Sequence, residues 1–298
     1  MKHEKKVVSL MNGILLIDKP QNYTSRDIVN IVSKKLGTKK IGHTGTLDPL
    51  ATGVLVLCVG NATKMVELVT AFEKEYIATI ILGIKTDTAD ITGSVVEESK
   101  VHISKEMIVE VCKKMTKTYE QTVPIYSAVK INGKKLYQYA RDGKKVKLPT
   151  RKVTIHELEC ISEPIYENGK TIFQIRALVS KGTYIRSLIE DVAKELSTIG
   201  TMSSLRRMKQ GNYTIEDCNT LEDMENETYQ IQDLTQILSQ YPIIVVDNYL
   251  ENRIKNGCIL ENRYQEEVIL FQNEQGIPLA LYKIYEKDPT KMKPWKML

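Results

Sequence analysis

The chain has 298 residues, of which 42% are hydrophobic and 27% are charged, and its formal net charge at pH 7 is +5. These values are ordinary for a globular protein and argue against a disordered or fibrous one, while the length suggests one large domain and a small one. Because no apolar run approaches the roughly 20 residues of a membrane span, and no signal-peptide core follows the basic start, we expect a cytoplasmic protein.

The N-terminal part is predicted to alternate strands and helices around a glycine-rich loop. Residues 13–18 form an apolar run that ends at Lys19-Pro20, as expected for a short buried strand. A helix should follow with Ser25 as its N-cap, because apolar residues recur at helical spacing up to a stop at Gly37. Beyond the glycine-rich stretch, the expected elements are a strand over 54–59, a helix over 63–72 and a strand over 76–82.

The middle of the chain continues this mixed pattern. Residues 86–93 are polar and are predicted to form a loop, and a helix should run from its cap at Ser104 to Met115. Two strands are expected next, over 153–160 and 171–179, and the turn Glu167-Asn168-Gly169-Lys170 separates them.

A further helix is expected immediately after this pair of strands. Thr183 is its predicted cap, and apolar residues then recur at helical spacing as far as Leu196. Residues 217–227 are typical of a linker, and a short helix is expected over 231–238. These elements complete a large domain in which helices and strands alternate irregularly.

From Tyr241 onward the sequence predicts a small β-rich appendage. Two apolar runs over 267–271 and 277–282 flank Asn273-Glu274-Gln275-Gly276, a combination that is typical of a hairpin. No internal repeat or low-complexity tract is found. The sequence as a whole therefore predicts an α+β protein.

One segment, over residues 124–152, is strongly basic. It contains nine basic residues and the single acid Asp142, and Tyr126, Tyr137 and Tyr139 are interleaved with them. Such a segment can neutralise phosphates and stack its rings on bases, although a charge run is also often no more than a solvated surface. Its glycines and Pro149 predict an inserted loop outside the core.

A carboxylate is presented within the glycine-rich loop, where Gly42 and Gly45 flank His43 and Asp48-Pro49 follows. An isolated Asp-Pro pair is typical of an aspartate that accepts backbone hydrogen bonds in a turn. The whole run over residues 42–55, GHTGTLDPLATGVL, closely resembles the catalytic motif of the TruB family of bacterial tRNA pseudouridine-55 synthases.

The resemblance to this family extends over most of the chain. The similar stretches follow one another in the same order and at the same spacing as in the family. The similar stretches outside the loop are 11–20, 75–76, 87–93, 124–130, 133–137, 182–188 and 205–207.

The resemblance implies a pseudouridine synthase fold, with a mixed or antiparallel sheet and flanking helices. On this basis residues 11–240 form the catalytic domain, and the basic insertion 124–152 belongs to it. Residues 241–298 would then form a small C-terminal RNA-binding domain of the PUA-like kind. Residues 1–10 precede the usual start of family members and are expected to be a disordered tail, with translation from Met11 as the alternative.

The reaction of the family requires an ionised carboxylate, and the resemblance assigns this role to Asp48. The reaction breaks the N1–C1′ glycosidic bond of uridine and rejoins the uracil to the sugar through C5. The target uridine must first leave its stack in the RNA. The carboxylate could attack the ring, attack the sugar or remove a sugar proton, and the sequence leaves these three open. A base that covers the carboxylate would raise its pKa, so a nearby cation is needed to keep it ionised. The resemblance assigns this cation to Arg186. Without the resemblance, a helical arginine would more simply be expected in a surface salt bridge. Tyr76 resembles the family tyrosine that stacks on the uracil, but an ordinary strand aromatic would look the same.

Five further residues are implied to contact substrate. His43 corresponds to a residue that occupies the space of the extruded nucleotide, although a lone loop histidine is often simply exposed. Lys19, Tyr184 and Leu205 correspond to positions around the pocket, and Leu205 could equally belong to the core. Lys130 lies in the basic segment.

The expected partner is the T arm of tRNA. The basic segment corresponds to the part of stand-alone family members that folds over this arm, and relatives that work inside guide-RNA particles typically lack it. We therefore expect an enzyme that needs no guide RNA and no protein partner, and a monomer is the default expectation for its oligomeric state. Recognition should depend on shape and phosphate contacts.

Two other functional classes are compatible with parts of the sequence. A non-catalytic protein that binds or folds tRNA would use the same surface without needing Asp48. A metal- or nucleotide-dependent hydrolase is suggested only by the acidic stretch 86–90 and the nearby glycines, and neither matches a P-loop or an EF-hand. Since the five cysteines include no C-x-x-C pair, neither a zinc site nor a disulfide framework is expected. Asp87 and Asp90 are interpreted as a brace for the loop near the active site, so we expect no metal and no cofactor.

Overall fold

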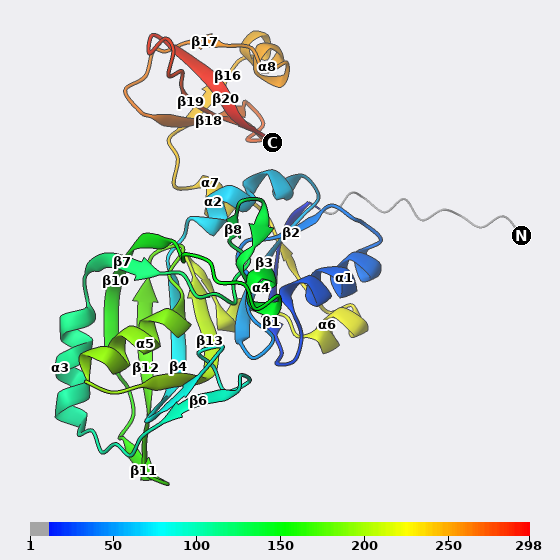
Figure 1. Ribbon diagram of the computed structural model, residues 1–298. Helices are drawn as coiled ribbons and strands as arrows, with labels where there is room; N and C mark the ends of the chain where they lie inside the picture. Colours follow the sequence, from blue (N-terminus) through cyan, green and yellow to red (C-terminus); the bar gives the residue numbers. More distant parts are fainter. Residues whose placement is uncertain (1–11) are drawn as a thin grey trace, which may run out of the picture.

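The computed structural model describes residues 12–298 of the chain (Figure 1). The tail expected over residues 1–10 lies outside this range. The described residues form a large mixed sheet with flanking helices and a separate smaller sheet near the C-terminus, so the predicted α+β class is confirmed. Among the helices of this range, none combines the length and the hydropathy that a membrane crossing requires.

The large sheet contains eleven strands and provides the platform for the rest of the domain. Neighbouring strands are antiparallel except β3 and β13, which run parallel. Its main path runs through β15 (Ile231–Gln232), β1 (Gly13–Lys19), β3 (Thr52–Val59), β13 (Gly200–Gln210), β4 (Lys74–Leu82), β12 (Lys170–Val179), β10 (Thr150–Cys160) and β7 (Thr118–Thr122). The short strands β2 (Ile41–His43), β11 (Ile165–Glu167) and β14 (Tyr213–Thr214) pair along its sides.

The strand β13 was not predicted, although it lies at the centre of the sheet between β3 and β4. Its sequence, GTMSSLRRMKQ, lacks the regular apolar alternation of a strand. The structure gives the reason, since the pairing of β13 with β4 shifts register between Met202 and Ser204 and again between Arg207 and Lys209. Each irregularity changes which residues face the core, and this hides the period-two signal.

Helices cover the sheet in two groups (Figure 1). The helices α3 (Lys105–Met115) and α5 (Ile185–Glu195) pack over β4, β12 and β10, and their apolar faces join the largest core cluster. The helices α1 (Ser25–Leu36) and α6 (Leu221–Asn226) pack beside β1 and β3 in a second cluster. Ser104 caps α3 as predicted, and Gly37 ends α1 in the left-handed conformation as predicted.

Several predicted boundaries were wrong. The N-cap of α1 is Thr24 and not Ser25, because the side chain of Thr24 accepts the hydrogen bond from the N–H of Asp27. The single helix expected over 63–72 is a 3-10 turn, η1 (Gly60–Met65), followed by α2 (Val66–Thr70). The segment 217–227, interpreted as a linker, contains α6, and the helix expected over 231–238 is reduced to β15 and α7 (Thr235–Leu238). A further 3-10 turn, η2 (Ile215–Asp217), follows β14.

The turn at Asn168-Gly169 closes a hairpin between β11 and β12, so it does not join the two long strands directly. Both residues have positive φ, at 50° and 74°, as the tight two-residue hairpin turn requires. The polar loop 86–93 connects β5 (Ile84–Thr86) to β6 (Val95–Glu98), a short hairpin beside the sheet.

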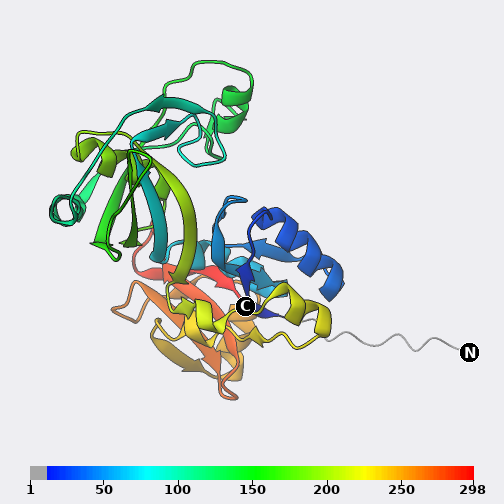
Figure 2. The same ribbon diagram turned by 90° about the horizontal axis from the view of Figure 1, so that it is seen from below.

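The basic segment 124–152 projects from the large sheet (Figure 2). The expectation of a loop was only partly right, because the segment forms the hairpin β8 (Lys130–Ile131) and β9 (Lys134–Lys135) and the helix α4 (Leu136–Arg141). Cations of this unit lie over tyrosine rings, with Lys134 above Tyr139 and Arg141 above Tyr137. The last residues of the segment belong to β10.

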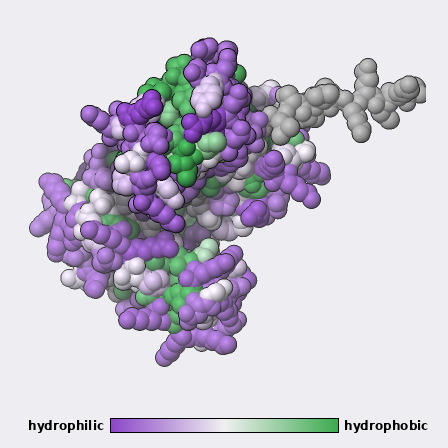
Figure 3. Space-filling view, turned by 90° about the horizontal axis from the view of Figure 1, so that it is seen from above, coloured by the Kyte–Doolittle hydropathy of each residue, from purple (hydrophilic) through white to green (hydrophobic). Residues whose placement is uncertain are grey.

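The C-terminal unit is a five-stranded sheet with one helix (Figure 1). The predicted hairpin is present as β18 (Val268–Asn273) and β19 (Pro278–Ile284). The other elements are β16 (Ile243–Val246), α8 (Asn248–Lys255), β17 (Leu260–Glu261) and β20 (Lys291–Met297). Leu270 and Leu281 share a core cluster with Val54 of the large sheet and Leu68 of α2, so the two units pack together through apolar contacts. The surface seen in Figure 3 is mostly hydrophilic, with small hydrophobic patches.

Candidate active site

A cavity of about 470 Å³ opens where the loop between β2 and β3 faces the start of α5. Its wall is built from parts of the chain that are far apart in the sequence: this loop, the end of α2, strands β4, β10 and β13, the start of the basic segment and the residues around the beginning of α5. The charged residues in its lining are Asp48, Lys74, Arg151, Arg186 and Arg207.

The loop that carries Asp48 is held from below by helix α1. The side-chain oxygen of Ser25 accepts a hydrogen bond from the N–H of Leu47 at 2.8 Å and lies 3.2 Å from the carbonyl of the same residue. The N–H of Asn22 donates to the carbonyl of Pro49 at 2.8 Å. Ser25 is therefore not the helix cap that the sequence suggested but a buried support for the residue before Asp48.

Strand β13 supports the other end of the loop through two buried polar side chains. Arg207 is 1% exposed and donates to the carbonyl of Val54 at 2.6 Å and to the carbonyl of Gly45 at 3.3 Å. Gln210 is fully buried and donates to the side-chain oxygen of Thr44 at 2.8 Å. Because buried polar groups without partners are costly, these bonds fix the loop in one conformation. Neither supporting role was predicted, because both residues lie on strand β13; Arg207 was noted only as part of the similar stretch 205–207.

The glycine at position 53 allows β3 and β13 to approach each other. Its φ is +98°, and a Cβ atom there would lie 2.2 Å from the carbonyl oxygen of Arg207. A side chain would be strained by both the conformation and the contact. Gly53 therefore brings the strand that carries Arg207 against the loop.

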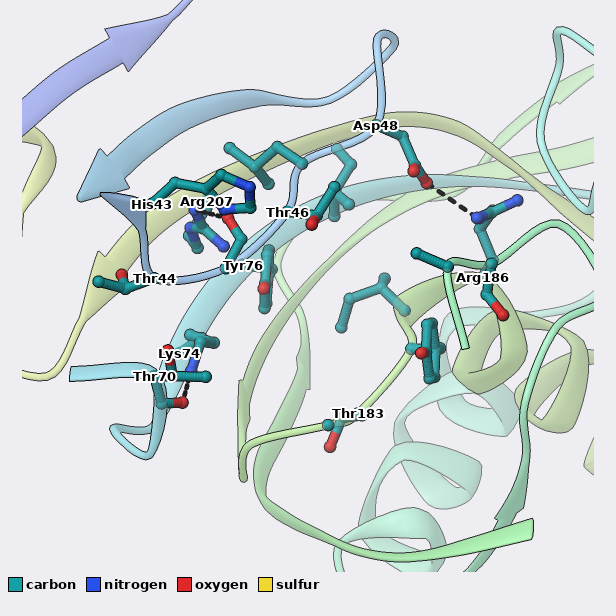
Figure 4. A pocket seen from close by; sticks show the side chains of 18 of the residues that line it. His43, Thr44, Thr46, Asp48, Thr70, Lys74, Tyr76, Thr183, Arg186 and Arg207 are labelled. Atoms are coloured by element: carbon teal, nitrogen blue, oxygen red, sulfur yellow. Dashed lines mark hydrogen bonds and ion pairs between the residues drawn. The ribbon is translucent and has the colours of Figure 1, made fainter. Parts of the chain in front are cut away.

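Arg186 lies in the first turn of α5 and contacts Asp48 in the wall of the cavity (Figure 4). Its Nη2 atom is 2.9 Å from Asp48 Oδ2, and its Nη1 atom is 3.7 Å from Asp90 Oδ2. The guanidinium also donates to the carbonyls of Thr88 at 3.0 Å and Tyr126 at 2.8 Å, and its side chain is only 8% exposed. The Asp48 side chain is 41% exposed, so a buried and fixed cation faces a carboxylate that is open to the cavity.

The start of α5 differs from the prediction. Thr183 does not cap the helix, because its hydroxyl donates to the carbonyl of Ser180. The residue at the cap position is Tyr184, whose own side chain makes no capping bond. The backbone N–H of Tyr184 donates instead to the side chain of Gln121 on β7, at 2.8 Å.

Four of the other predicted residues line the cavity, namely Tyr76, Leu205, Tyr184 and His43. Tyr76 lies on β4 and is 7% exposed. Burial lowers the pKa of His43, with smaller contributions from the charges of Arg26 and Arg207, so a neutral imidazole is favoured. Its Nδ1 atom is buried and has no hydrogen-bond partner among residues 12–298.

Lys19 and Lys130 are not in the cavity wall. Lys19 is fully buried behind the loop and donates to the carbonyls of Pro20 and Tyr23. Burial lowers its pKa to about 8, and the negative charge of Asp48 partly opposes this shift. Lys130 is an exposed residue of β8 in the basic segment.

Lys74 is also buried but, unlike Lys19, it lines the cavity. It was not among the predicted site residues. It is 7% exposed and donates to the carbonyls of Thr70 and Phe72 at the end away from Asp48 (Figure 4). Burial lowers its pKa to about 8, and the charge of Arg207 adds to the effect. The cavity therefore contains one carboxylate among several cations, which suits a polyanionic ligand.

The geometry brings one accessible carboxylate, one fixed guanidinium and one buried aromatic ring to the same cavity. These groups can hold a planar base and supply a negatively charged oxygen at its edge. Within residues 12–298 no group of three or more His, Cys, Asp or Glu side chains is arranged to bind a metal ion. The absence of a cofactor stays a prediction.

Two family descriptions match consecutive parts of the chain. Residues 33–185 match the TruB family pseudouridylate synthase N-terminal domain, and residues 186–252 match the tRNA pseudouridylate synthase B C-terminal domain. Together these matches cover well over half of the chain.

Curated relatives match nearly the full length. The chain is 40% identical to the tRNA pseudouridine synthase B of Bacillus pumilus, over 97% of this chain and 98% of that one. It is 41% identical to the tRNA pseudouridine synthase B of Bacillus cytotoxicus, over 97% of both chains.

Solved structures show the same fold at lower identity. A Cbf5–Nop10–Gar1 complex contains a chain that is 22% identical, with a TM-score of 0.68 over 99% of this chain and 86% of that one. An H/ACA ribonucleoprotein bound to a substrate RNA contains a chain that is 20% identical, with a TM-score of 0.67 over 97% of this chain and 84% of that one.

Proposed function

The chain belongs to the TruB family of pseudouridine synthases, and from this premise we propose that it isomerises the T-loop uridine of tRNA, position 55, to pseudouridine. Asp48 is the catalytic carboxylate, Arg186 is its cationic partner and Tyr76 is the ring that stacks on the target base. The single observation that carries this assignment is the 2.9 Å contact between the open carboxylate and the buried guanidinium, at the mouth of a cavity large enough for a nucleotide.

The reaction conserves atoms, so the enzyme needs to supply only groups that move protons and hold the base. The N1–C1′ bond of uridine breaks, the uracil turns, and a C5–C1′ bond forms. The C5 proton leaves to solvent and N1 gains a proton. Asp48 acts in its ionised form at the sugar or the ring, and Arg186 stabilises that form once the base has displaced water from the cavity.

The uridine must be extruded from the T loop to reach Asp48. His43, Tyr184 and Leu205 line the cavity and are suited to contact the extruded nucleotide. Their neutral character fits a pocket for a base, while the cations around them suit the phosphates on each side.

The basic segment 124–152 is proposed to hold the T arm. Its cations and tyrosines lie together on a unit that projects from the sheet, and Lys130 belongs to this surface rather than to the cavity. The C-terminal unit, residues 241–298, is proposed to be a PUA-like domain that adds contacts to tRNA. Because both RNA-binding surfaces lie on one chain, the enzyme needs no guide RNA. We further propose that it acts as a monomer in the cytoplasm.

The test is tritium release from a tRNA transcript that carries uridine labelled at C5. The wild-type protein, Asp48→Asn and the control Asp288→Asn, which alters a half-buried aspartate of the C-terminal unit, are compared with EDTA present. We expect label release from the wild type and from the control and none from Asp48→Asn, which should still bind tRNA. If none of the three proteins releases label while all bind tRNA, the rival interpretation as a non-catalytic tRNA-binding protein is the better one.

A further inference from the structure

A buried glutamine on the edge strand β7 contacts the beginning of α5 with both ends of its amide. The side chain of Gln121 accepts a hydrogen bond from the N–H of Tyr184 at 2.8 Å through Oε1. Its Nε2 atom donates to the carbonyl of the same residue at 3.2 Å. Gln121 is 1% exposed, so water does not compete for these bonds. The amide therefore pairs with Tyr184 much as a neighbouring strand would.

A second set of hydrogen bonds fixes which way the amide points. The hydroxyl of Tyr119 donates to Asp191 Oδ2 at 2.8 Å and so presents its oxygen lone pairs to Gln121. The Nε2 atom of Gln121 donates to this oxygen at 3.0 Å. Because an ionised carboxylate can only accept, the chain has one direction from Gln121 to Asp191. The Oε1 atom must then face the N–H of Tyr184.

This contact gives a partner to one of the N–H groups at the start of α5. Helix α5 begins after Tyr184 without a capping bond from that residue's own side chain, and its first N–H groups have no acceptors within the helix. Gln121 supplies one acceptor from another strand. Two further bonds join the same regions, since Ser187 donates to the carbonyl of Thr122 and Arg186 donates to the carbonyl of Tyr126.

The position of this contact matters because Arg186 follows Tyr184 by two residues. The guanidinium reaches Asp48 only if the first turn of α5 starts at the correct place and in the correct direction. A shift of about 1 Å at a positioning group can cost up to a hundredfold in rate. The Tyr184 side chain, which lines the cavity, depends on the same backbone.

We propose that Gln121 is a positioning residue for the isomerisation, which holds both backbone groups of Tyr184 and thereby directs Arg186 toward Asp48. Asp191 and Tyr119 act through Gln121 by fixing the orientation of its amide. This inference rests on the proposed function, because it assigns Arg186 a part in the reaction.

The test compares Gln121→Met with Ser187→Ala. Methionine keeps the approximate volume and loses every hydrogen bond of the amide, while Ser187→Ala removes a different bond between α5 and the end of β7. We measure the single-turnover rate constant at saturating enzyme, the dissociation constant for tRNA and the fraction of folded protein. We expect Gln121→Met to lower the rate constant by about tenfold to a hundredfold with little change in tRNA affinity, and Ser187→Ala to stay within about twofold of wild type.

A double-mutant cycle with Arg186→Lys separates positioning from general loss of stability. If Gln121 acts through Arg186, adding Gln121→Met to Arg186→Lys should cost much less than it costs in the wild type. If the two losses multiply, or if Gln121→Met affects the rate no more than Ser187→Ala, the proposal is overturned. A loss of tRNA affinity at an unchanged rate constant would overturn it too.

A second variant decides the matter if Gln121→Met does not fold. Tyr119→Phe preserves the ring and removes the hydroxyl that orients the amide, so the rate constant should fall about two- to fivefold at unchanged tRNA affinity. An unchanged rate constant in this variant contradicts the proposal. Failure of the proposed function looks different, because the wild type itself would then release no label, and the role of Gln121 would fall with it.

Discussion

Replacing Arg186 by glutamine should remove most of the catalytic rate while leaving a folded protein. The substitution deletes the cation that lies 2.9 Å from Asp48 Oδ2 and 3.7 Å from Asp90 Oδ2. Asp90 retains donors after this change, because Thr88 and Thr92 both donate to its Oδ1 atom. Asp48 would keep the electrostatic attraction of the buried Lys19, but among residues 12–298 no second ion pair of its carboxylate is described.

The size of the effect follows from the electrostatics of the pair. Two unit charges about 4 Å apart attract by about 4 kcal/mol at an effective dielectric constant of about 20. The Asp48 side chain is 41% exposed in the free protein, so solvent screens part of this attraction until a bound base displaces the water. Since about 1.4 kcal/mol corresponds to a factor of ten in rate, we expect the rate constant to fall by about a hundredfold to a thousandfold.

The assay is single-turnover tritium release at saturating enzyme, with tRNA affinity measured on the same samples. The matched control is Arg206→Gln, because Arg206 also pairs with a carboxylate, Asp18, at 2.7 Å but is 39% exposed and lies outside the cavity lining. This control should retain activity within about threefold of wild type, since an exposed ion pair contributes little. The reasoning is refuted if Arg186→Gln stays within tenfold of wild type, or if Arg206→Gln loses as much.

Three further predictions concern pH, the core and RNA binding. Burial lowers the pKa of Lys74 from 10.5 to about 8, so between pH 8 and 10.5 the unfolded chain binds more protons than the folded protein. The free energy of unfolding, measured with urea, should therefore rise with pH in this window by up to about 3 kcal/mol relative to Lys74→Met. A difference between the two proteins that does not change with pH would contradict this prediction. Leu281→Ala should lower the free energy of unfolding by about 2–5 kcal/mol, because this fully buried side chain belongs to the core cluster that both units share. A loss below about 1 kcal/mol, measured by urea denaturation, would argue against that packing. Replacing the exposed Lys144, Lys145 and Lys147 by alanine should weaken tRNA binding without changing the single-turnover rate constant. The slope of the logarithm of the binding constant against the logarithm of the salt concentration should decrease in magnitude by about 1 to 3. An unchanged slope would exclude phosphate contacts by these residues.

Local patterns were sufficient where one segment dictates its own conformation. The apolar run of β1, the periodicity and glycine stop of α1, the Ser104 cap of α3 and the β18–β19 hairpin were all predicted correctly. In each of these the side-chain period or the turn chemistry is uninterrupted along the segment. Strand β13 failed for the opposite reason, since its two register shifts exist only in relation to β4.

The predicted site residues divide in the same way. Asp48 and Arg186 could be singled out because each lies in a continuous stretch that resembles a motif of the family; local pattern alone favoured a turn aspartate and a surface salt bridge. Lys19 and Lys130 illustrate the limit, because the fold buries the first behind the loop and carries the second out on the basic segment. A position in the sequence does not state on which side of a loop its side chain will lie.

Local sequence patterns specify the class of the fold, most of its helices and strands, and the loop that presents a carboxylate, because these depend on neighbours within a few residues. The contact between Asp48 and Arg186 depends on the packing of the whole domain, as do the bonds by which Ser25, Arg207 and Gln121 hold the backbone on both sides of the cavity. The supporting residues are polar and buried, and their bonds join strands and helices that are distant in the chain. Such pairs form because a buried polar group requires a partner, and which partner it finds is fixed by the packing of the whole domain.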